Sequence, residues 1–104
     1  MLIYGLKTCD TCRKALKSLP EARLVDIRAE GLPEPVLRRA AAQFGPDLVN
    51  RRSTTWRALS EEDRALAPET LIARQPAVMK RPLIDDGGTL YLGWSDEVRA
   101  ALVG

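Results

Sequence analysis

The residues best suited to chemistry in this sequence are Cys9 and Cys12, which form a Cys-Asp-Thr-Cys motif. The thiolate form of cysteine is a nucleophile and a metal ligand, so this spacing indicates either redox chemistry or part of a metal site. The chain contains no histidine, which excludes a Cys-His catalytic pair and imidazole ligands. A structural zinc site needs about four nitrogen or sulfur ligands, so we expect no metal unless two chains share a site. The motif therefore favours redox chemistry.

The two cysteines are expected to differ in role because they differ in position. Cys9 falls between a predicted strand and a predicted helix, where unpaired backbone N–H groups and the helix dipole stabilise an anion. Lys7 and Arg13 would add positive potential there, and Asp10 would oppose it. Cys12 lies one helical turn further along, on the apolar stripe, so it should be the more buried sulfur. We interpret Cys9 as the attacking nucleophile and Cys12 as the resolving thiol; in the plainer alternative, both are structural residues without special reactivity.

Apolar periodicity predicts a strand–helix–strand unit at the start of the chain. Residues 2–5 have the pattern of a short buried strand, and apolar residues from Cys12 to Leu19 recur at helical spacing until Pro20. Residues 24–27 have the pattern of a second strand, which should run parallel to the first because a helix connects them. This unit places the cysteine motif at the start of its helix.

The remaining segments complete an α/β fold. Residues from about 31 to 75 are polar and helical in pattern, and we interpret them as an insertion. Its helix signals lie at residues 36–44, 60–63 and 68–72. Strand patterns at 82–84 and 89–92 flank Asp85-Asp86-Gly87-Gly88, which predicts a hairpin, and Ser95-Asp96-Glu97 predicts the start of a last helix. The order β-α-β, insertion, β-β-α predicts a single domain over residues 1–104 with a thioredoxin-like fold and a four-stranded mixed sheet.

Arg81 and Pro82 precede the third predicted strand. Proline cannot donate to a sheet ladder, so it should mark a strand start or a special turn, and a cis Arg81–Pro82 bond would be a deliberate feature. In this fold, the loop before the third strand meets the start of the first helix. Arg81 would then face Cys9 and hold an anionic group or stabilise the thiolate. In the alternative interpretation, Arg81 is a solvated surface charge and Pro82 only opens a strand.

Net charge and the distribution of apolar residues indicate where the protein is located and which partners it does not bind. The formal net charge of +2 is too small to indicate nucleic acid or an anionic membrane as a partner. No stretch approaches the roughly 18 apolar residues of a membrane span, and the first residues become charged too soon for a signal peptide. We therefore expect a cytoplasmic protein with reduced thiols and no direct binding to membranes or nucleic acid.

Four segments spread over most of the chain follow a familiar order. They are Tyr4–Thr11, Asn50–Arg57, Pro76–Leu83 and Leu92–Ser95. In these segments the sequence resembles the ArsC/Spx family of arsenate reductases and their relatives, and most closely its YffB-like branch. The resemblance implies a thioredoxin-like fold with a helical insertion, a nucleophile at Cys9, and an arginine at Arg81 followed by a proline that is typically cis. It also implies glutathione as a co-substrate, glutaredoxin as a further candidate partner, and no bound cofactor.

These arguments give two sets of candidate site residues. The candidate catalytic residues are Cys9, Cys12 and Arg81. The candidate substrate- or glutathione-binding residues are Lys7, Thr8, Thr11, Arg13, Arg81, Pro82 and Trp56. Trp56 would either stack against a bound thiol or pack in a core. The expected function is that of a glutathione-dependent thiol-disulfide oxidoreductase acting on glutathione or a small thiol or disulfide substrate.

The resemblance leaves two other functions open. Arsenate reductases of the family are similar at Cys9 and Arg81 but use further arginines, and Asn50 and Trp94 stand where two of them would be. Spx regulators also carry a Cys-x-x-Cys motif followed by Arg-Lys, which implies a redox switch that binds RNA polymerase. The YffB-like relatives share the asparagine and the tryptophan and are regarded as glutathione-dependent thiol reductases, which favours the oxidoreductase.

Overall fold

The structure is a computed structural model that describes residues 1–103. The chain forms two compact units, one made of residues up to Glu30 and from Arg81 onward, the other of Gly31–Lys80. The second unit contains the predicted insertion and ends at Lys80, where the sequence pattern suggested about residue 75. That the two units make one domain stays a prediction.

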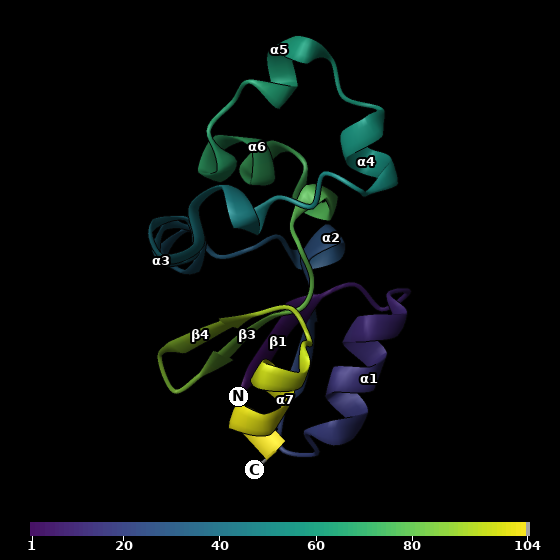
Figure 1. Cartoon of the computed structure of the whole chain (residues 1–104), viewed down its shortest axis with the longest axis vertical. Helices are drawn as coiled ribbons and strands as arrows, with labels where there is room; N and C mark the ends of the chain where they lie inside the picture. Colours follow the sequence, from purple (N-terminus) through teal and green to yellow (C-terminus); the bar gives the residue numbers. More distant parts are fainter. Residues whose placement is uncertain (104) are drawn as a thin grey trace. The chain divides into compact units, whose positions relative to one another are not determined.

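The first unit contains a four-stranded mixed sheet, as predicted (Figure 1). Its strands are β1 (Leu2–Gly5), β2 (Arg23–Asp26), β3 (Leu83–Asp86) and β4 (Thr89–Leu92), in the order β2-β1-β3-β4. β1 pairs with β2 in parallel, while β3 pairs antiparallel with both β1 and β4. β1 is therefore a central strand, and its last residues lead directly into the loop that carries Cys9.

Two strands, β2 and β3, have boundaries that differ from the predicted residues 24–27 and 82–84, and the ends of both have a local reason. β2 ends at Asp26, and Ile27 instead begins the short helix α2 (Ile27–Glu30). The Asp26 carboxylate causes this switch, because its Oδ1 accepts hydrogen bonds from the N–H groups of Arg28 (2.9 Å) and Ala29 (3.2 Å). Asp86 pairs with Thr89 inside the hairpin, so the turn is Gly87-Gly88 alone. Both glycines have positive φ, +59° and +101°, as a tight two-residue turn requires.

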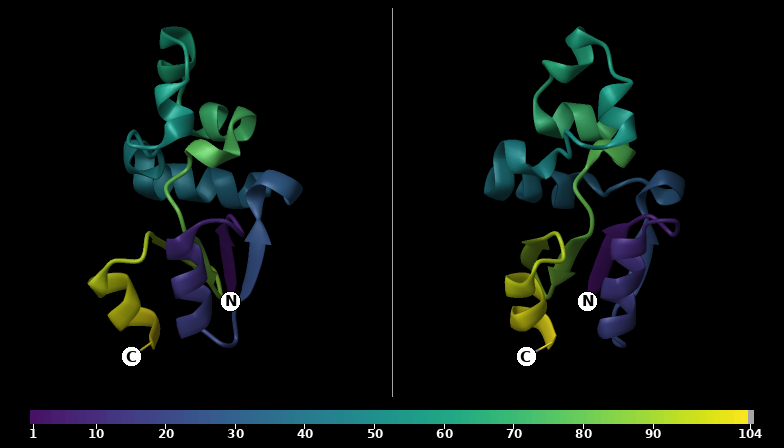
Figure 2. Two further views of the ribbon diagram at one scale, coloured as in Figure 1. Left: turned by 90° about the vertical axis from the view of Figure 1, so that its right-hand side faces the viewer. Right: turned by 45° about the vertical axis from the view of Figure 1, so that its right-hand side comes forward.

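Two helices, α1 (Asp10–Ser18) and α7 (Asp96–Val103), lie on the same face of this sheet (Figure 2). Ile3 and Ile84 of the sheet pack with Ala15 and Leu19, and Trp94 packs against the same cluster. α1 begins at Asp10, two residues before the first apolar residue of its stripe, because Asp10 and Thr11 are polar and leave no mark on the apolar pattern. α7 begins after Ser95, whose Oγ accepts a hydrogen bond from the Val98 N–H (3.2 Å), as the sequence predicts.

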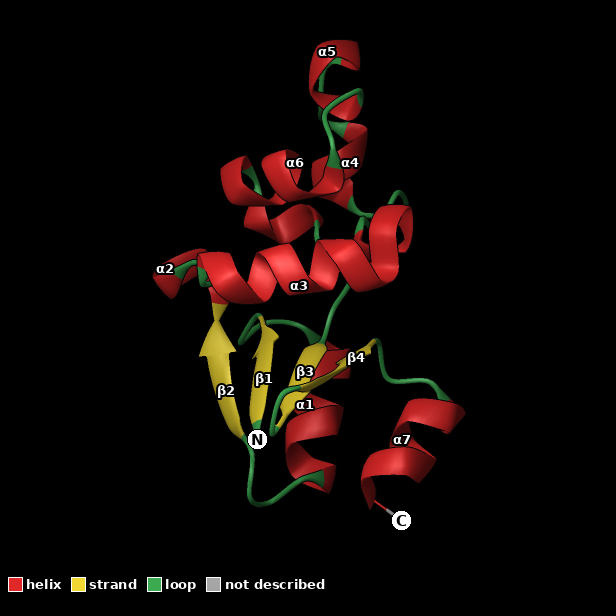
Figure 3. Cartoon of the chain, turned by 90° about the vertical axis from the view of Figure 1, so that its left-hand side faces the viewer, coloured by secondary structure: helices red, strands yellow, loops and turns green. Residues whose placement is uncertain are grey.

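The second unit is helical, as predicted (Figure 3). Its elements are α3 (Glu34–Phe44), the 3-10 helix η1 (Gly45–Leu48), α4 (Thr54–Arg57), α5 (Glu61–Arg64), α6 (Pro68–Arg74) and the 3-10 helix η2 (Pro76–Val78). Ser53 and Ser60 cap α4 and α5 with their side chains. Leu37, Leu71 and Ile72 are among the residues buried in its core. None of the helices within residues 1–103 is long and apolar enough to cross a bilayer.

Candidate functional site

Cys9 occupies the N-cap position of α1, at the end of the loop that follows β1. Its backbone is extended, with φ −86° and ψ 118°. The Cys9 N–H donates to the Leu6 carbonyl (3.1 Å), and the Cys9 carbonyl accepts from the Arg13 N–H (3.0 Å). The first bond closes the turn between Leu6 and Cys9, and the second joins Cys9 to the first turn of α1. Cys9 is half-buried and therefore partly accessible from solvent.

Cys12 lies one turn further along α1 and is completely buried. This confirms the predicted difference in burial between the two cysteines, both of which are free thiols. The Cys12 sulfur packs directly against Gly5 at the end of β1, where a Cβ atom would overlap the sulfur and would lie 3.2 Å from the Cys12 Cβ. A side chain at position 5 would therefore occupy the space that Cys12 needs.

Replacing Gly5 with alanine should destabilise the protein by about 1–3 kcal/mol, because the added methyl group overpacks a filled site. Urea denaturation of the wild-type and G5A proteins measures the change. In a Cys12→Ala background the sulfur is gone, so the same Gly5→Ala substitution should cost clearly less. Equal costs in the two backgrounds would show that Gly5 and Cys12 do not interact.

Arg81 and Pro82 reach the same site from the start of β3. The Arg81–Pro82 peptide bond is cis, as the family resemblance implies. Pro82 is buried, and its carbonyl accepts a hydrogen bond from the Gly93 N–H (2.8 Å). This anchoring holds the half-buried Arg81 where its side chain interacts with Cys9 through a hydrogen bond and through its charge. The structure therefore brings together Cys9, Cys12 and Arg81, the three candidate catalytic residues.

The two thiols have opposite acid–base properties. Burial alone would raise the pKa of Cys9, but interactions with the Cys12 N–H, the Cys12 thiol and the Arg81 side chain outweigh it, and the pKa is lowered. Cys9 makes no side-chain cap bond of ideal geometry, so we attribute this effect to several donors acting together. Burial raises the pKa of Cys12 to about 12, and the neighbouring Cys9 adds to the rise. Cys9 is therefore the more acidic thiol of the pair, and Cys12 is a protonated thiol beside it.

Asp26 braces the cysteine loop, a role that the sequence patterns did not predict. While its Oδ1 caps α2, its Oδ2 accepts a hydrogen bond from the Lys7 N–H (3.2 Å). The signal was present in the sequence, because Asp26 ends a strand parallel to β1 and the carboxyl ends of parallel strands meet at one edge. Hydrogen bonding to the Lys7 N–H, then to those of Ala29 and Arg28, lowers the pKa of Asp26 below its usual 3.8.

Asp26 should make the free energy of unfolding decrease as the pH falls into the acidic range. A carboxyl group whose pKa is lowered by folding stabilises the folded state above its unfolded pKa, and this contribution disappears as the pH falls through the folded value. The Asp26→Asn variant should therefore be less stable than wild type near ~pH 7 and should approach it at about pH 2.5. Urea denaturation at both pH values measures the two differences. A difference that does not shrink in acid would contradict the role of the carboxylate.

The other candidate binding residues of the first unit surround this loop with their side chains exposed. Lys7, Thr8 and Thr11 lie on either side of Cys9 in the chain. Arg13 is used within the protein, because its Nε donates to the Lys7 carbonyl (2.8 Å) and its Nη1 lies 3.9 Å from Asp10 Oδ1. Arg13 thus braces the loop from α1, as Asp26 does from β2.

Trp56 belongs to the second unit and was predicted either to stack on a bound thiol or to pack in a core. It is half-buried, and the guanidinium carbons of Arg51 and Arg64 lie 5.8 Å and 5.4 Å from its ring centroid. A binding role for Trp56 stays a prediction.

The two positions where the family's arsenate reductases would have arginines play structural roles. Trp94 packs against the hydrophobic cluster beneath α1 and α7. Asn50 shapes the turn before α4, because its Oδ1 accepts from the Arg52 N–H (3.0 Å) and its carbonyl accepts from the Ser53 hydroxyl (2.7 Å). Neither side chain supplies a positive charge.

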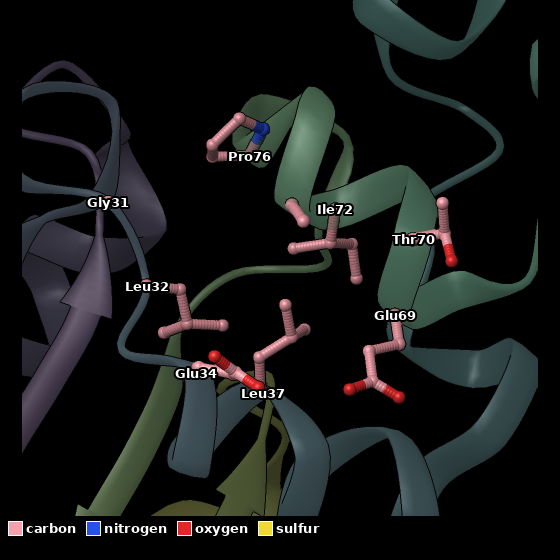
Figure 4. A pocket seen from close by; sticks show the side chains of 9 residues that line it. Gly31, Leu32, Glu34, Leu37, Glu69, Thr70, Ile72 and Pro76 are labelled. Carbon is pink, nitrogen blue, oxygen red and sulfur yellow. The ribbon is translucent and has the colours of Figure 1, made fainter.

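A hollow of about 470 Å³ lies in the second unit. Leu32, Leu37 and Ile72 point toward one another across it, and the carboxylates of Glu34 and Glu69 lie near its edge (Figure 4). It contains none of the candidate site residues. The chemistry of this chain is therefore associated with the start of α1 and not with this hollow.

The cysteine loop, the cis proline and the mixed sheet agree with one family of proteins. The sequence model of the ArsC family matches residues 4–102. The chain belongs to the ArsC family. An uncharacterized protein of Haemophilus influenzae is 41% identical over 91% of each chain.

Two solved structures extend this assignment to the fold. The YffB protein is 33% identical and superimposes with a TM-score of 0.84, covering 99% of this chain and 98% of its own. An arsenate reductase-related protein from Brucella melitensis is 34% identical with a TM-score of 0.68, covering 96% and 91%. The thioredoxin-like fold is thereby confirmed. Together with the paired thiols, these relatives identify this ArsC-family member as a thiol-based redox protein.

Proposed function

We propose that this ArsC-family protein is a glutathione-dependent thiol-disulfide oxidoreductase with Cys9 as its nucleophile. The observation that carries the proposal is the lowered pKa of Cys9 in a half-exposed position beside Arg81. A thiolate is the reactive form of cysteine, and access to it is the second requirement for exchange. The same chemistry fits a cytoplasmic setting, in which glutathione is the abundant thiol.

The reaction would proceed in two exchange steps. The Cys9 thiolate attacks the glutathione sulfur of a mixed disulfide, which breaks the S–S bond, releases the substrate thiolate and leaves glutathione disulfide-bonded to Cys9. A second glutathione thiolate then attacks the bound glutathione sulfur and releases Cys9 as a thiolate. Overall, one free glutathione and the glutathionyl group of the mixed disulfide combine into one glutathione disulfide, and the substrate is released as a free thiol. Arg81 would stabilise the Cys9 thiolate at the start and end of this cycle.

Glutathione, not Cys12, is the proposed resolving thiol. The Cys12 sulfur is completely buried against Gly5, and burial raises its pKa to about 12, so little of it is nucleophilic at neutral pH. Its thiol instead supports Cys9, because its interaction with the Cys9 sulfur lowers the pKa of Cys9. This gives Cys12 a positioning role in place of the resolving role first expected.

Cys12 variants test this assignment. The Cys12→Ser variant should keep turnover within about threefold of wild type, because serine retains a hydrogen-bond donor and glutathione still resolves the adduct. The measurement is the steady-state reduction of a glutathione mixed disulfide, with mass spectrometry of the protein during turnover. A large loss of turnover with glutathione trapped on Cys9 would instead show that Cys12 resolves the intermediate.

Arsenate reduction is the second candidate, because Cys9 and Arg81 lie together and a 34% identical relative is described as arsenate reductase-related. The structural roles of Asn50 and Trp94 weigh against it, since they leave the oxyanion with fewer positive charges. We expect arsenate to cause no saturable change in calorimetric titration or in the alkylation rate of Cys9. Saturable binding coupled to glutathione oxidation would favour this second candidate.

A further inference from the structure

Trp56 and two arginines form a second cluster of charged and aromatic side chains, outside the cysteine site. The guanidinium carbons of Arg51 and Arg64 both lie within 6 Å of the Trp56 ring centroid, at 5.8 Å and 5.4 Å. Within residues 1–103, neither arginine forms a salt bridge with a carboxylate. The acidic residues of α5 precede Arg64 in the chain but do not pair with it. Two guanidinium groups therefore lie near the Trp56 indole, and within residues 1–103 neither is paired with a carboxylate.

Arg64 is held in place by the backbone of α4. Its Nε donates to the Trp56 carbonyl (3.3 Å), and its Nη2 donates to the Arg57 carbonyl (3.0 Å). These two bonds fix the plane of the guanidinium and leave its remaining donors for another acceptor. A carboxylate matches such donors in shape and charge. Because Arg64 is already ordered, little side-chain entropy would be lost on binding.

A small apolar hollow adjoins these charges. It has a volume of about 110 Å³ and is lined by Val49, Leu66 and Leu71 together with Trp56 and the two arginines. A cavity of about 150 Å³ accommodates benzene, so this hollow suits a smaller, aliphatic group. We propose that this cluster, which we call the Trp56 site, binds small carboxylates that carry a short branched aliphatic chain. The charge contacts the arginines, and the aliphatic part fills the hollow.

The test uses the indole N–H signals of Trp56 and Trp94 in ¹⁵N NMR spectra of the full chain. Trp94 lies in the first unit and serves as the internal reference, and a Trp94→Phe variant assigns the two signals. Isovalerate should shift the Trp56 signal saturably and leave the Trp94 signal in place. Its neutral analogue 3-methylbutan-1-ol lacks the charge, and formate lacks the aliphatic chain, so each should bind at least about tenfold more weakly.

Arginine variants separate this site from general attraction of anions. The Arg64→Gln and Arg51→Gln variants should each weaken isovalerate binding by about tenfold. Arg52→Gln removes the same charge from a neighbouring exposed residue that, among the described residues, forms no cation–π contact with the indole, and it should bind isovalerate like wild type. An unsaturable shift, an equal effect of the alcohol, or an equal loss in Arg52→Gln would overturn the proposal. None of these outcomes depends on catalysis by Cys9.

Discussion

Replacing Cys9 with serine should abolish thiol-disulfide exchange, lowering turnover by about a thousandfold or more. Cys9 is the half-exposed thiol of the pair, and its pKa is the one that is lowered. A serine hydroxyl at the same position stays protonated at neutral pH and forms no mixed disulfide. The measurement is the glutathione-dependent reduction of a mixed disulfide, with the free energy of unfolding measured in parallel to show that the variant is folded.

The matched control for this experiment is Cys12→Ser, which makes the same chemical change one helical turn away. It should retain exchange, because the nucleophile and its access are unaltered. If Cys9→Ser kept more than about a tenth of wild-type turnover, Cys9 would not be the nucleophile. If both variants lost turnover equally, the two cysteines would act as a disulfide-forming pair, and the proposed role of glutathione would fail.

Replacing Arg81 with glutamine should slow the alkylation of Cys9 by on the order of tenfold at neutral pH and should move its pH profile to higher pH. The hydrogen bond and charge of Arg81 are two of the interactions that lower the pKa of Cys9 against the effect of burial. Without these two interactions, the effect of burial raises the pKa of Cys9, and a smaller fraction of its thiol is ionised at neutral pH. The rate of iodoacetamide alkylation at Cys9, followed by peptide mass spectrometry across a pH series, gives both quantities.

Two comparisons show whether Arg81 acts locally. Arg81→Lys keeps the charge but not the planar donors, so its profile should lie between those of wild type and Arg81→Gln. Lys17→Gln removes one charge from the last turn of α1, at the end opposite Cys9, and should leave the profile unchanged. A shift in Lys17→Gln as large as that in Arg81→Gln would mean that overall charge, and not the contact with Arg81, controls Cys9.

The elements that hold the site were predictable wherever side-chain burial left a regular pattern. Cys12 falls on the apolar stripe with Ala15 and Leu19, and all three are buried. The hairpin followed from its two glycines, although its turn proved shorter than expected. By contrast, the first two residues of α1, Asp10 and Thr11, are polar, so the apolar pattern of this helix begins only at Cys12.

The contacts that tune the site were harder to predict because they join residues distant in sequence. Arg81 could be placed beside Cys9 only through the assumed fold, since nothing local distinguishes it from a surface arginine. The bond between Asp26 and the Lys7 N–H depends on where β2 ends, which the apolar pattern placed one residue too late. The contact of Gly5 with the Cys12 sulfur depends on how closely α1 approaches β1, a distance that no sequence pattern encodes.

The surroundings of Cys9 lower its pKa, and the pH dependence of its alkylation in the wild-type protein tests this most directly. Cys12 is buried and protonated at neutral pH, so alkylation before unfolding should report on Cys9 alone. We expect the alkylation rate to reach its thiolate plateau with a midpoint below the free-cysteine pKa of about 8.5. A midpoint at or above that value would contradict it, because Cys9 would then be an ordinary thiol.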